Sequence, residues 1–206
     1  MSSHPIVLAS SSPQRQRLLT DAGFAFQIIP PRDGAESGIC TQCGPAELVT
    51  ELAQSKASDV AAQIREATAQ LSDDALLIAC DTVAECQGQI LGKPTSEDHA
   101  ADMLRRLRGT VHRVYSGLTL ANCSSRGELS EVDTRLAVSE LRMDDLSDES
   151  LDEYMESGLW RAKAGAIGYQ DRVGWLHLLK GSESNVIGLP MELLSEMLAS
   201  RRPNKP

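Results

Sequence analysis

The sequence predicts an α/β fold with a mixed sheet flanked by helices. Two observations predict it: short apolar runs typical of strands alternate with helical stripes, and several strands are joined by hairpin-like turns. A chain of 206 residues fits one large domain or one domain of two lobes. Because no internal repeat and no long linker divides it, we expect a single domain over residues 1–206 with a frayed tail at about 201–206.

Each expected element has a local signal, and the first half of the chain shows these signals clearly. Ser12 caps the first helix, Pro13 occupies its first turn and Gly23 ends it. Gln87 and Gly88 stand between two apolar runs, as in a β-hairpin. The expected elements are a strand at 5–9, a helix at 13–23, a strand at 24–30, a helix from about 45 to 70, and paired strands at 75–86 and 89–92.

The second half of the chain continues in the same way. Its helices are indicated by apolar stripes between capping and stop residues, and its strands by β-branched and apolar runs. The expected elements are a helix at 96–109, strands at 112–123 and 129–142 joined by a turn at 124–127, a helix at 147–158, a strand at 174–179 and a last helix at 189–200.

Composition limits the class of partner. The formal net charge is −9 at pH 7, and aromatic residues make up 3% of the chain. Net negative charge repels nucleic acids and anionic membrane surfaces, and scarce aromatics leave few platforms for stacking single-stranded bases. We therefore expect no nucleic acid polymer and no membrane as partner. A phosphate-bearing partner would be small and bound by a few local cations.

The sequence also indicates the compartment. It contains no run of about 18 apolar residues that could span a membrane, and its polar N-terminus is unlike a secretory signal, so we expect a cytoplasmic protein. The five cysteines show no framework spacing, which suits reduced thiols. Cys40 and Cys43 have the spacing of a zinc half-site or a redox pair, but no second cluster follows. An ordinary loop is the favoured interpretation of this pair.

The first expected strand ends in a polar and cationic cluster, in the segment VLASSSPQRQRLL at residues 7–19. A serine-rich turn between a strand and a helix directs backbone N–H groups and the positive end of the helix dipole at one point. Ser10, Ser11 and Ser12 add hydroxyl groups, and the guanidinium of Arg15 suits phosphate. The segment therefore indicates an anion site, although it is not a Walker loop. A capped surface helix is the alternative.

An acidic residue, Asp81, lies inside the run LLIACDTVAEC, which otherwise predicts a buried strand. An unpaired carboxylate there would be strongly destabilising, so proteins keep one where a metal, a cation or a catalytic duty accompanies it. The alternative is that Asp81 marks an exposed strand end. Lys93 follows the hairpin in a Gly-Lys-Pro sequence, and hairpin geometry returns it near Asp81.

A second lysine interrupts an apolar stripe. In the long predicted helix Leu48, Leu52, Val60 and Ile64 recur at helical spacing, with Lys56 in the middle. Such a lysine either snorkels to the edge of the apolar face, which is the commoner outcome, or points into a polar cleft.

The segment KAGAIGYQ at residues 163–170 combines glycines with small residues, which allows a backbone to approach a flat ligand. Gln170 carries a donor and an acceptor on one amide, which suits the edge of a uracil or thymine ring. A tight connection without a ligand is the alternative. Other hydrolase classes are disfavoured, because the sequence has neither a G-x-S-x-G elbow nor an H-x-x-x-H pair among its four histidines.

Several motifs follow one another in a specific order: LASSSPQRQRLL, ELAQSKA, ACDTVAECQGQILGKP, KAGAIGYQ and NVIGLPM. Together they resemble the Maf family of nucleoside triphosphate pyrophosphatases over about residues 6–198. The resemblance implies hydrolysis of a nucleoside triphosphate to the monophosphate and pyrophosphate, with Mg²⁺ or Mn²⁺, as house-cleaning of nucleotide pools. It also implies an inosine-triphosphatase-like fold of two lobes around a cleft, often dimeric, so a homodimer is one expected assembly.

The resemblance also assigns roles. Asp81 matches the general base, and a role as metal ligand alone would look the same in sequence. Glu36 matches an acidic residue that holds the metal together with Asp81, with Asp33 as a competing candidate. The residues that match the triphosphate site are Ser10, Ser12, Arg15, Lys56 and Lys93.

Three further positions are associated with base choice in the family: Gln14, Thr82 and Gln170. Thr82 and Gln170 resemble the branch that acts on dTTP and UTP, whereas Gln14 departs from the arginine of that branch. The alternatives are a pyrophosphatase for 7-methyl-GTP or for many nucleotides, and a non-catalytic nucleotide-binding regulator of cell division, since the family is also linked to septum formation.

Overall fold

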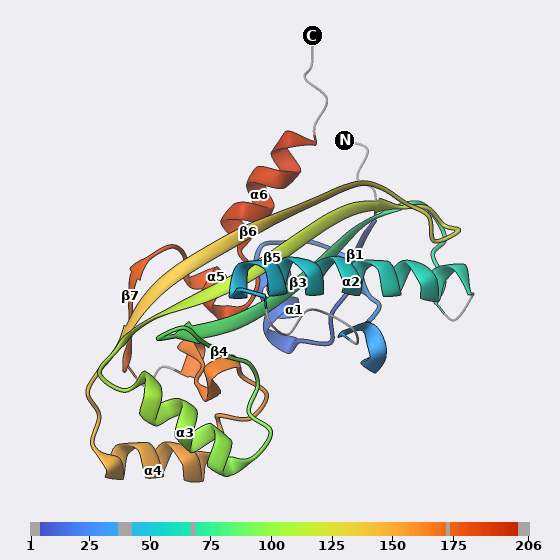
Figure 1. The fold of residues 1–206 in the computed structure, drawn as a ribbon. Helices are drawn as coiled ribbons and strands as arrows, with labels where there is room; N and C mark the ends of the chain where they lie inside the picture. The colour runs from blue at the N-terminus through green and yellow to red at the C-terminus, as the bar shows by residue number, and fades with distance from the viewer. Residues whose placement is uncertain (1–4, 37–42, 67–68, 172–173, 202–206) are drawn as a thin grey trace.

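The computed structural model describes residues 5–36, 43–66, 69–171 and 174–201. These residues form a sheet of seven strands in the order β2-β1-β3-β5-β6-β7, with β4 beside β3. The long strands β3, β5 and β6 run across the molecule in Figure 1. The strands are β1 (Ile6–Leu8), β2 (Phe26–Ile28), β3 (Ala75–Cys86), β4 (Gln89–Leu91), β5 (Val111–Cys123), β6 (Leu129–Met143) and β7 (Leu176–Lys180).

The sheet is mixed, as predicted. β1 is parallel to β2 and β3, whereas the β3–β4, β3–β5, β5–β6 and β6–β7 pairs are antiparallel. The connection between β3 and β4 is the predicted hairpin. Gln87 and Gly88 have φ angles of 52° and 82°, and a type I′ turn requires positive φ at both central residues.

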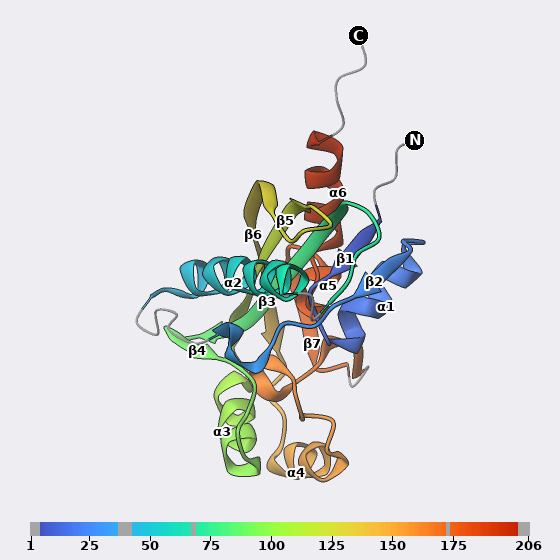
Figure 2. The same cartoon turned by 90° about the vertical axis from the view of Figure 1, so that its right-hand side faces the viewer.

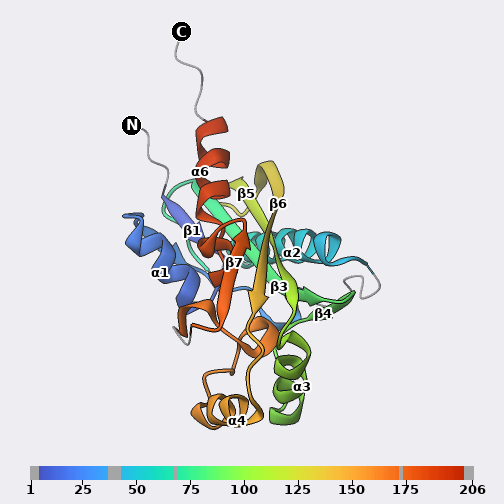
Figure 3. The same cartoon turned by 90° about the vertical axis from the view of Figure 1, so that its left-hand side faces the viewer.

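Helices cover both faces of the sheet. Figures 2 and 3 show α2 on one side and α1, α5 and α6 on the other, while α3 and α4 lie together beyond one end of the long strands (Figure 1). The α-helices are α1 (Pro13–Asp21), α2 (Pro45–Arg65), α3 (Glu97–Leu107), α4 (Asp148–Ser157), α5 (Glu183–Ile187) and α6 (Met191–Ser200). Three short 3-10 helices are η1 (Asp33–Glu36), η2 (Ala164–Ala166) and η3 (Tyr169–Asp171).

Alternation along β3 divides the core between the two faces. Leu77 and Ala79 pack with α2 residues such as Val60, while Ile78 and Cys80 pack on the opposite face with α1 and α6, because successive side chains of a strand point to opposite faces. A third cluster joins the far end of β3 and β5 to α3 and α4. The core is thus divided into two clusters on the faces of the sheet and a third at one end of it.

The expected helices and strands are present, with differences in their bounds and some additional short elements. The helix expected to reach about residue 70 ends at Arg65, just after the apolar stripe ends at Ile64. The five-residue helix α5 was not predicted, because it is too short to show helical periodicity and follows its N-cap Ser182 directly. Arg201 was expected in a frayed tail, but its guanidinium donates to Leu120 O at 2.8 Å and to Asn122 Oδ1 at 3.1 Å. Residues 202–206 lie outside the described part of the chain.

The cysteines follow the expectation of reduced thiols only in part. Cys80, Cys86 and Cys123 are free and buried. Cys43 is disulfide-bonded, so the expectation is wrong for this residue, and Cys40 lies outside the described residues. Across the described ranges, none of the helices combines the length and apolar content needed to span a bilayer.

Candidate active site

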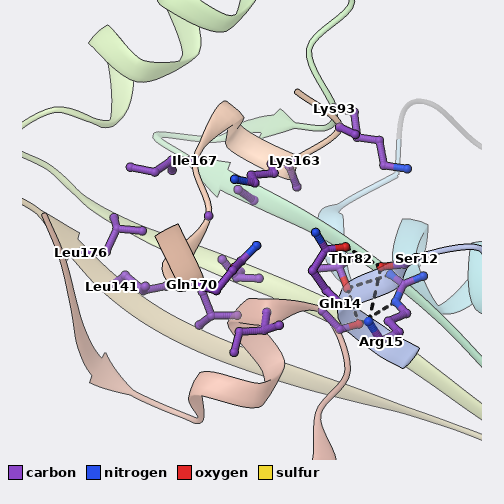
Figure 4. A pocket seen from close by; sticks show the side chains of 18 of the residues that line it. Ser12, Gln14, Arg15, Thr82, Lys93, Leu141, Lys163, Ile167, Gln170 and Leu176 are labelled. Atoms are coloured by element: carbon purple, nitrogen blue, oxygen red, sulfur yellow. Dashed lines mark hydrogen bonds between the residues drawn. The ribbon is translucent and has the colours of Figure 1, made fainter. Parts of the chain in front are cut away.

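A pocket of about 350 Å³ brings together four of the segments that the sequence singled out, whereas Ser10, Lys56 and Asp81 are not among the residues that line it. Its walls come from the start of α1, from β3, from the loop after β4, from the segment around η2 and η3, and from the end of α5. In Figure 4 the side chains of Ser12, Arg15 and Thr82 gather at one end, Leu141 and Leu176 lie at the other, and Gln170 stands between them. The volume is in the range of small-ligand sites.

The polar end of the pocket is the serine-rich corner before α1. Ser12 caps the helix by accepting from the backbone N–H of Arg15 at 3.5 Å, and its hydroxyl donates to Gln14 Oε1 at 3.0 Å. The buried hydroxyl of Ser10 accepts from the Ser12 N–H at 3.1 Å and from Arg15 Nη1 at 3.3 Å. The corner therefore combines a helix N-terminus with a positioned guanidinium, a combination suited to anions.

Arg15 is fixed by residues far away in the sequence. Its Nε donates to Gly188 O at 2.7 Å and its Nη2 to Thr82 Oγ1 at 3.3 Å. Thr82 Oγ1 in turn lies 2.9 Å from Ser116 Oγ and 3.3 Å from Gly188 O. Within the described residues, the bonds from Arg15 to Gly188, Ser10 and Thr82 use three of its five N–H donors. Two donors are left for a ligand.

Asp81 lies on the other face of β3 from Thr82, towards α2. It is 9% exposed in the middle of a 12-residue strand, so the alternative of an exposed strand end is wrong. Lys56 Nζ donates to Asp81 Oδ1 and is itself 7% exposed. Lys56 therefore does not snorkel to solvent. It is the cation that compensates the buried carboxylate.

A close approach between α2 and the sheet makes this ion pair possible. Gly117 lies directly opposite Asp81 in the β3–β5 register. A Cβ atom at Gly117 would lie 2.1 Å from Val49 O on α2, so only glycine leaves room for the helix backbone there. Val49 precedes Lys56 by two helical turns, and this contact sets the depth at which α2 packs.

Lys93 lies on the exposed rim of the pocket, after β4. Leu91 pairs with Ala84, so the chain returns along β3 towards Thr82, and Lys93 and Thr82 both line the pocket. The predicted neighbour of Lys93 was Asp81, which does not line the pocket. The neighbouring wall is the segment 163–170, which is joined to this loop because Gly165 N donates to Gly92 O at 3.1 Å. Two motifs separated in sequence thus form one side of the pocket.

Asp171 holds the segment that carries Gln170. Its carboxylate accepts from Lys163 Nζ, from the hydroxyl of Tyr154 at 2.6 Å and from the N–H of Gly168 at 3.2 Å. Burial raises the pKa of Tyr154, and the carboxylate of Asp171 raises it further, so the hydroxyl stays a donor. The sequence did not single out Asp171, since an acidic residue after a glycine-rich loop is common.

The apolar end of the pocket was also not predicted. Periodicity identifies buried residues but does not show which of them face a shared cavity. The apolar side chains at this end are Ala84, Leu107, Val114, Leu141, Ile167, Leu176 and Val186. With these residues the pocket has one cationic and one apolar end.

The predicted metal ligands can be placed in part. Asp33 is exposed in η1. Glu36 ends η1, and its side chain lies outside what the structure describes. The preceding carbonyl of Ala35 accepts from Ser55 Oγ, which brings the end of η1 against α2 at the residue before Lys56.

A Mg²⁺ ion in a nucleotide enzyme is commonly bound by one or two carboxylates together with substrate phosphates. The Asp81 carboxylate fits such a site as a hard oxygen donor. Among the residues that the structure describes, the cluster Cys43, Glu47 and Glu51 brings three potential ligand atoms within 4.8 Å of one another. It does not fit, because a disulfide sulfur is not a thiolate.

The chain is similar to known proteins over most of its length. A family model described as Maf-like protein matches residues 5–201. A protein from Rhodopirellula baltica named dTTP/UTP pyrophosphatase is 46% identical over 200 residues, which is 97% of this chain and 83% of that protein. A protein of the same name from Carboxydothermus hydrogenoformans is 39% identical and covers 92% of this chain and 94% of its own length.

Among solved structures, a HAM1 protein from Coxiella burnetii aligns with 15% identity and a TM-score of 0.45, covering 96% of this chain and 99% of that one. The family model covers nearly the whole described chain, and the two relatives are similar over 83% and 94% of their own length. This chain belongs to the Maf family.

Proposed function

We propose that this protein is a nucleoside triphosphate pyrophosphatase that converts dTTP and UTP to the monophosphates and pyrophosphate. The observation that carries the proposal is a single pocket with Arg15 and Lys93 at one end and Gln170 beside an apolar wall further in. The name dTTP/UTP pyrophosphatase, given to the relatives above, supports the same substrates.

The triphosphate would lie at the serine-rich corner. The N-terminus of α1 and the two remaining N–H groups of Arg15 would bind phosphate oxygens, and Lys93 would approach from the rim. These groups neutralise charge and fix the orientation of the chain of phosphates. Positioning and charge neutralisation are the largest contributions to phosphate-transfer catalysis.

Asp81 would orient and deprotonate the water that attacks the α-phosphorus. β1 ends at Leu8, which pairs with Ile78, so the serine segment leaves the sheet beside the next residues of β3, including Asp81. Lys56 holds the carboxylate in place. General-base assistance contributes about 10²–10⁴-fold. Asp81 and Glu36 would also hold a divalent cation, which, when bound, draws negative charge from the phosphate oxygens.

Base choice would depend on Gln170, whose amide offers one donor and one acceptor. Thr82 would act indirectly, because its hydroxyl already contacts Ser116, Gly188 and Arg15. Gln14 accepts a hydrogen bond from Ser12 at the polar end of the pocket. Its effect on base choice would therefore be exerted through the serine-rich corner and not by contact with the base.

The test is pyrophosphate release from a panel of dTTP, UTP, CTP, ATP, GTP and 7-methyl-GTP, each with Mg²⁺ and with Mn²⁺. Preferred turnover of dTTP and UTP supports the proposal. Preference for 7-methyl-GTP, or equal turnover of all nucleotides, would contradict the substrate assignment. Absence of pyrophosphate with every nucleotide, despite nucleotide binding, would contradict the activity and favour the regulator of cell division.

We also propose that the protein is cytoplasmic and assembles as a homodimer. The molecular mass of one chain is 22.3 kDa, and light scattering on the purified protein distinguishes one chain from two.

A further inference from the structure

His112 lies at the apolar end of the pocket and has an unsatisfied hydrogen-bonding atom. It lines the pocket together with Val114, its neighbour on the same face of β5. The residue is 3% exposed, and its Nδ1 atom has no hydrogen-bond partner in the described structure. Buried polar groups in native proteins nearly always have a partner, so this nitrogen requires an explanation.

The surroundings of His112 keep the ring uncharged. Burial lowers the pKa of His112 from 6.5 to about 4, and its partner in the β5–β6 register is the buried, apolar Leu141. At neutral pH the imidazole therefore has one N–H donor and one acceptor nitrogen. A neutral ring in an apolar wall is suited to recognise a neutral, planar ligand rather than a phosphate.

The ring edge of uracil and thymine has two carbonyl acceptors on either side of an N–H donor. The amide of Gln170 can bond the N–H and one carbonyl, which leaves the second carbonyl in need of a donor. Lys163 also lines this part of the pocket, but its ammonium is paired with Asp171. Among the described pocket residues at the apolar end, the ring N–H of His112 is the remaining side-chain donor.

We propose that His112 donates a hydrogen bond to a carbonyl oxygen of the pyrimidine ring and determines base specificity together with Gln170. This inference rests on the proposed function, since it names the group that binds the base of that substrate. The donor would be Nε2, since Nδ1 is enclosed by protein atoms and out of reach of a ligand in the pocket.

The kinetic test compares His112→Phe and His112→Gln with the unchanged protein on UTP, 2-thio-UTP and 4-thio-UTP. A thiocarbonyl is a weaker acceptor, so the unchanged protein should discriminate against the analogue altered at the contacted position. His112→Phe should lower kcat/KM for UTP by about 3- to 10-fold, the usual effect of one neutral hydrogen bond, and should lose that discrimination. His112→Gln keeps an N–H donor and should restore part of both.

Leu141→Met is the matched control, because it alters the apolar wall beside His112 without changing a hydrogen-bonding group. It should change kcat/KM for UTP and both thio analogues by the same factor. The inference is overturned if His112→Phe also leaves the ratio of kcat/KM for UTP to kcat/KM for each analogue at its value in the unchanged protein.

A second measurement needs no substitution and no turnover. UMP is added to the protein carrying isotope-labelled histidine, and the ring nitrogens are followed by NMR. The resonances of one neutral histidine should shift on saturation with UMP and stay in place with pyrophosphate, which occupies the opposite end. If no histidine nitrogen shifts with saturating UMP, the inference is overturned even when UTP is hydrolysed. If UMP shifts the histidine but no nucleotide is hydrolysed, the proposed function fails and the binding role of His112 stands.

Discussion

Lys56 donates a hydrogen bond to Asp81 across the interface between α2 and β3, and both residues are less than a tenth exposed. Removing one partner of a buried ion pair leaves an uncompensated charge, which typically destabilises a protein by about 3–5 kcal/mol. Asp81→Asn should therefore lower the free energy of unfolding as well as abolish hydrolysis. Urea denaturation and pyrophosphate release measure the two effects separately.

The double variant Asp81→Asn with Lys56→Met is the control for this prediction. It removes both charges and should recover most of the lost stability without recovering activity. Recovery of activity in the double variant would show that Asp81 acts only through the ion pair and not on the substrate.

The contact between Gly117 and the backbone of Val49 should be sensitive to a single methyl group. Gly117→Ala places a Cβ atom 2.1 Å from Val49 O, so α2 must move away from the sheet and carry Lys56 with it. Overpacking of this kind costs about 1–3 kcal/mol. Thermal or urea unfolding should reveal this loss together with reduced turnover. Gly92→Ala, whose Cβ meets no atom within 4 Å, should change stability far less.

The depressed pKa of His112 makes stability depend on pH. Because the pKa falls from 6.5 to about 4 on folding, below pH 6.5 the unfolded chain takes up a proton that the folded protein does not. Stability should therefore fall as the pH drops from about 6.5 to about 4, by up to about 3 kcal/mol from this residue. Urea midpoints across that range measure the slope, and His112→Phe should flatten it. Equal slopes in both proteins would contradict the prediction.

Asp171 should affect substrate binding without touching the phosphates. Asp171→Asn weakens its bonds to Lys163, Tyr154 and Gly168 and frees the segment that positions Gln170. We expect KM for UTP to rise by about tenfold, or about 1.4 kcal/mol, with a smaller change in kcat. Tyr154→Phe removes only one of the three donors and should have a weaker effect in the same steady-state assay.

The two ends of the pocket should respond differently to substitution. Gln170→Glu replaces a donor by an acceptor and should change the order of preference among nucleotides. Lys93→Ala should lower kcat/KM for every nucleotide by a similar factor, because the phosphates are common to all. The same nucleotide panel measures both variants. A uniform loss with Gln170→Glu would exclude it from base recognition.

Local patterns in the sequence predicted most of the fold. Ser12 and Pro13 marked the start of α1, and the hairpin at Gln87 and Gly88 has the backbone that its residues require. The polar end of the pocket was predictable for the same reason, since its chemistry is concentrated in short segments. Lys56 and Asp81 were each detectable because they interrupt apolar patterns, although the bond between them was not.

What the sequence did not predict depends on contacts between distant segments. Nothing near Arg15 in the sequence indicates that the carbonyl of Gly188 will accept from its Nε. The role of Asp171 as a shared acceptor, and the position of His112 in the pocket wall, follow from packing between elements far apart in the chain. A single buried histidine in a strand is compatible with many environments, so the residues that surround it could be identified only from the structure.

The bond between Arg15 and Gly188 spans 173 positions and has a consequence for biogenesis. While the ribosome is still adding the last segments, a nascent chain lacks the acceptor that fixes the guanidinium. Nucleotide hydrolysis should therefore begin only once synthesis has passed α5 and that segment has docked. Shortened chains that end before this helix should be inert even where most of their sheet has formed.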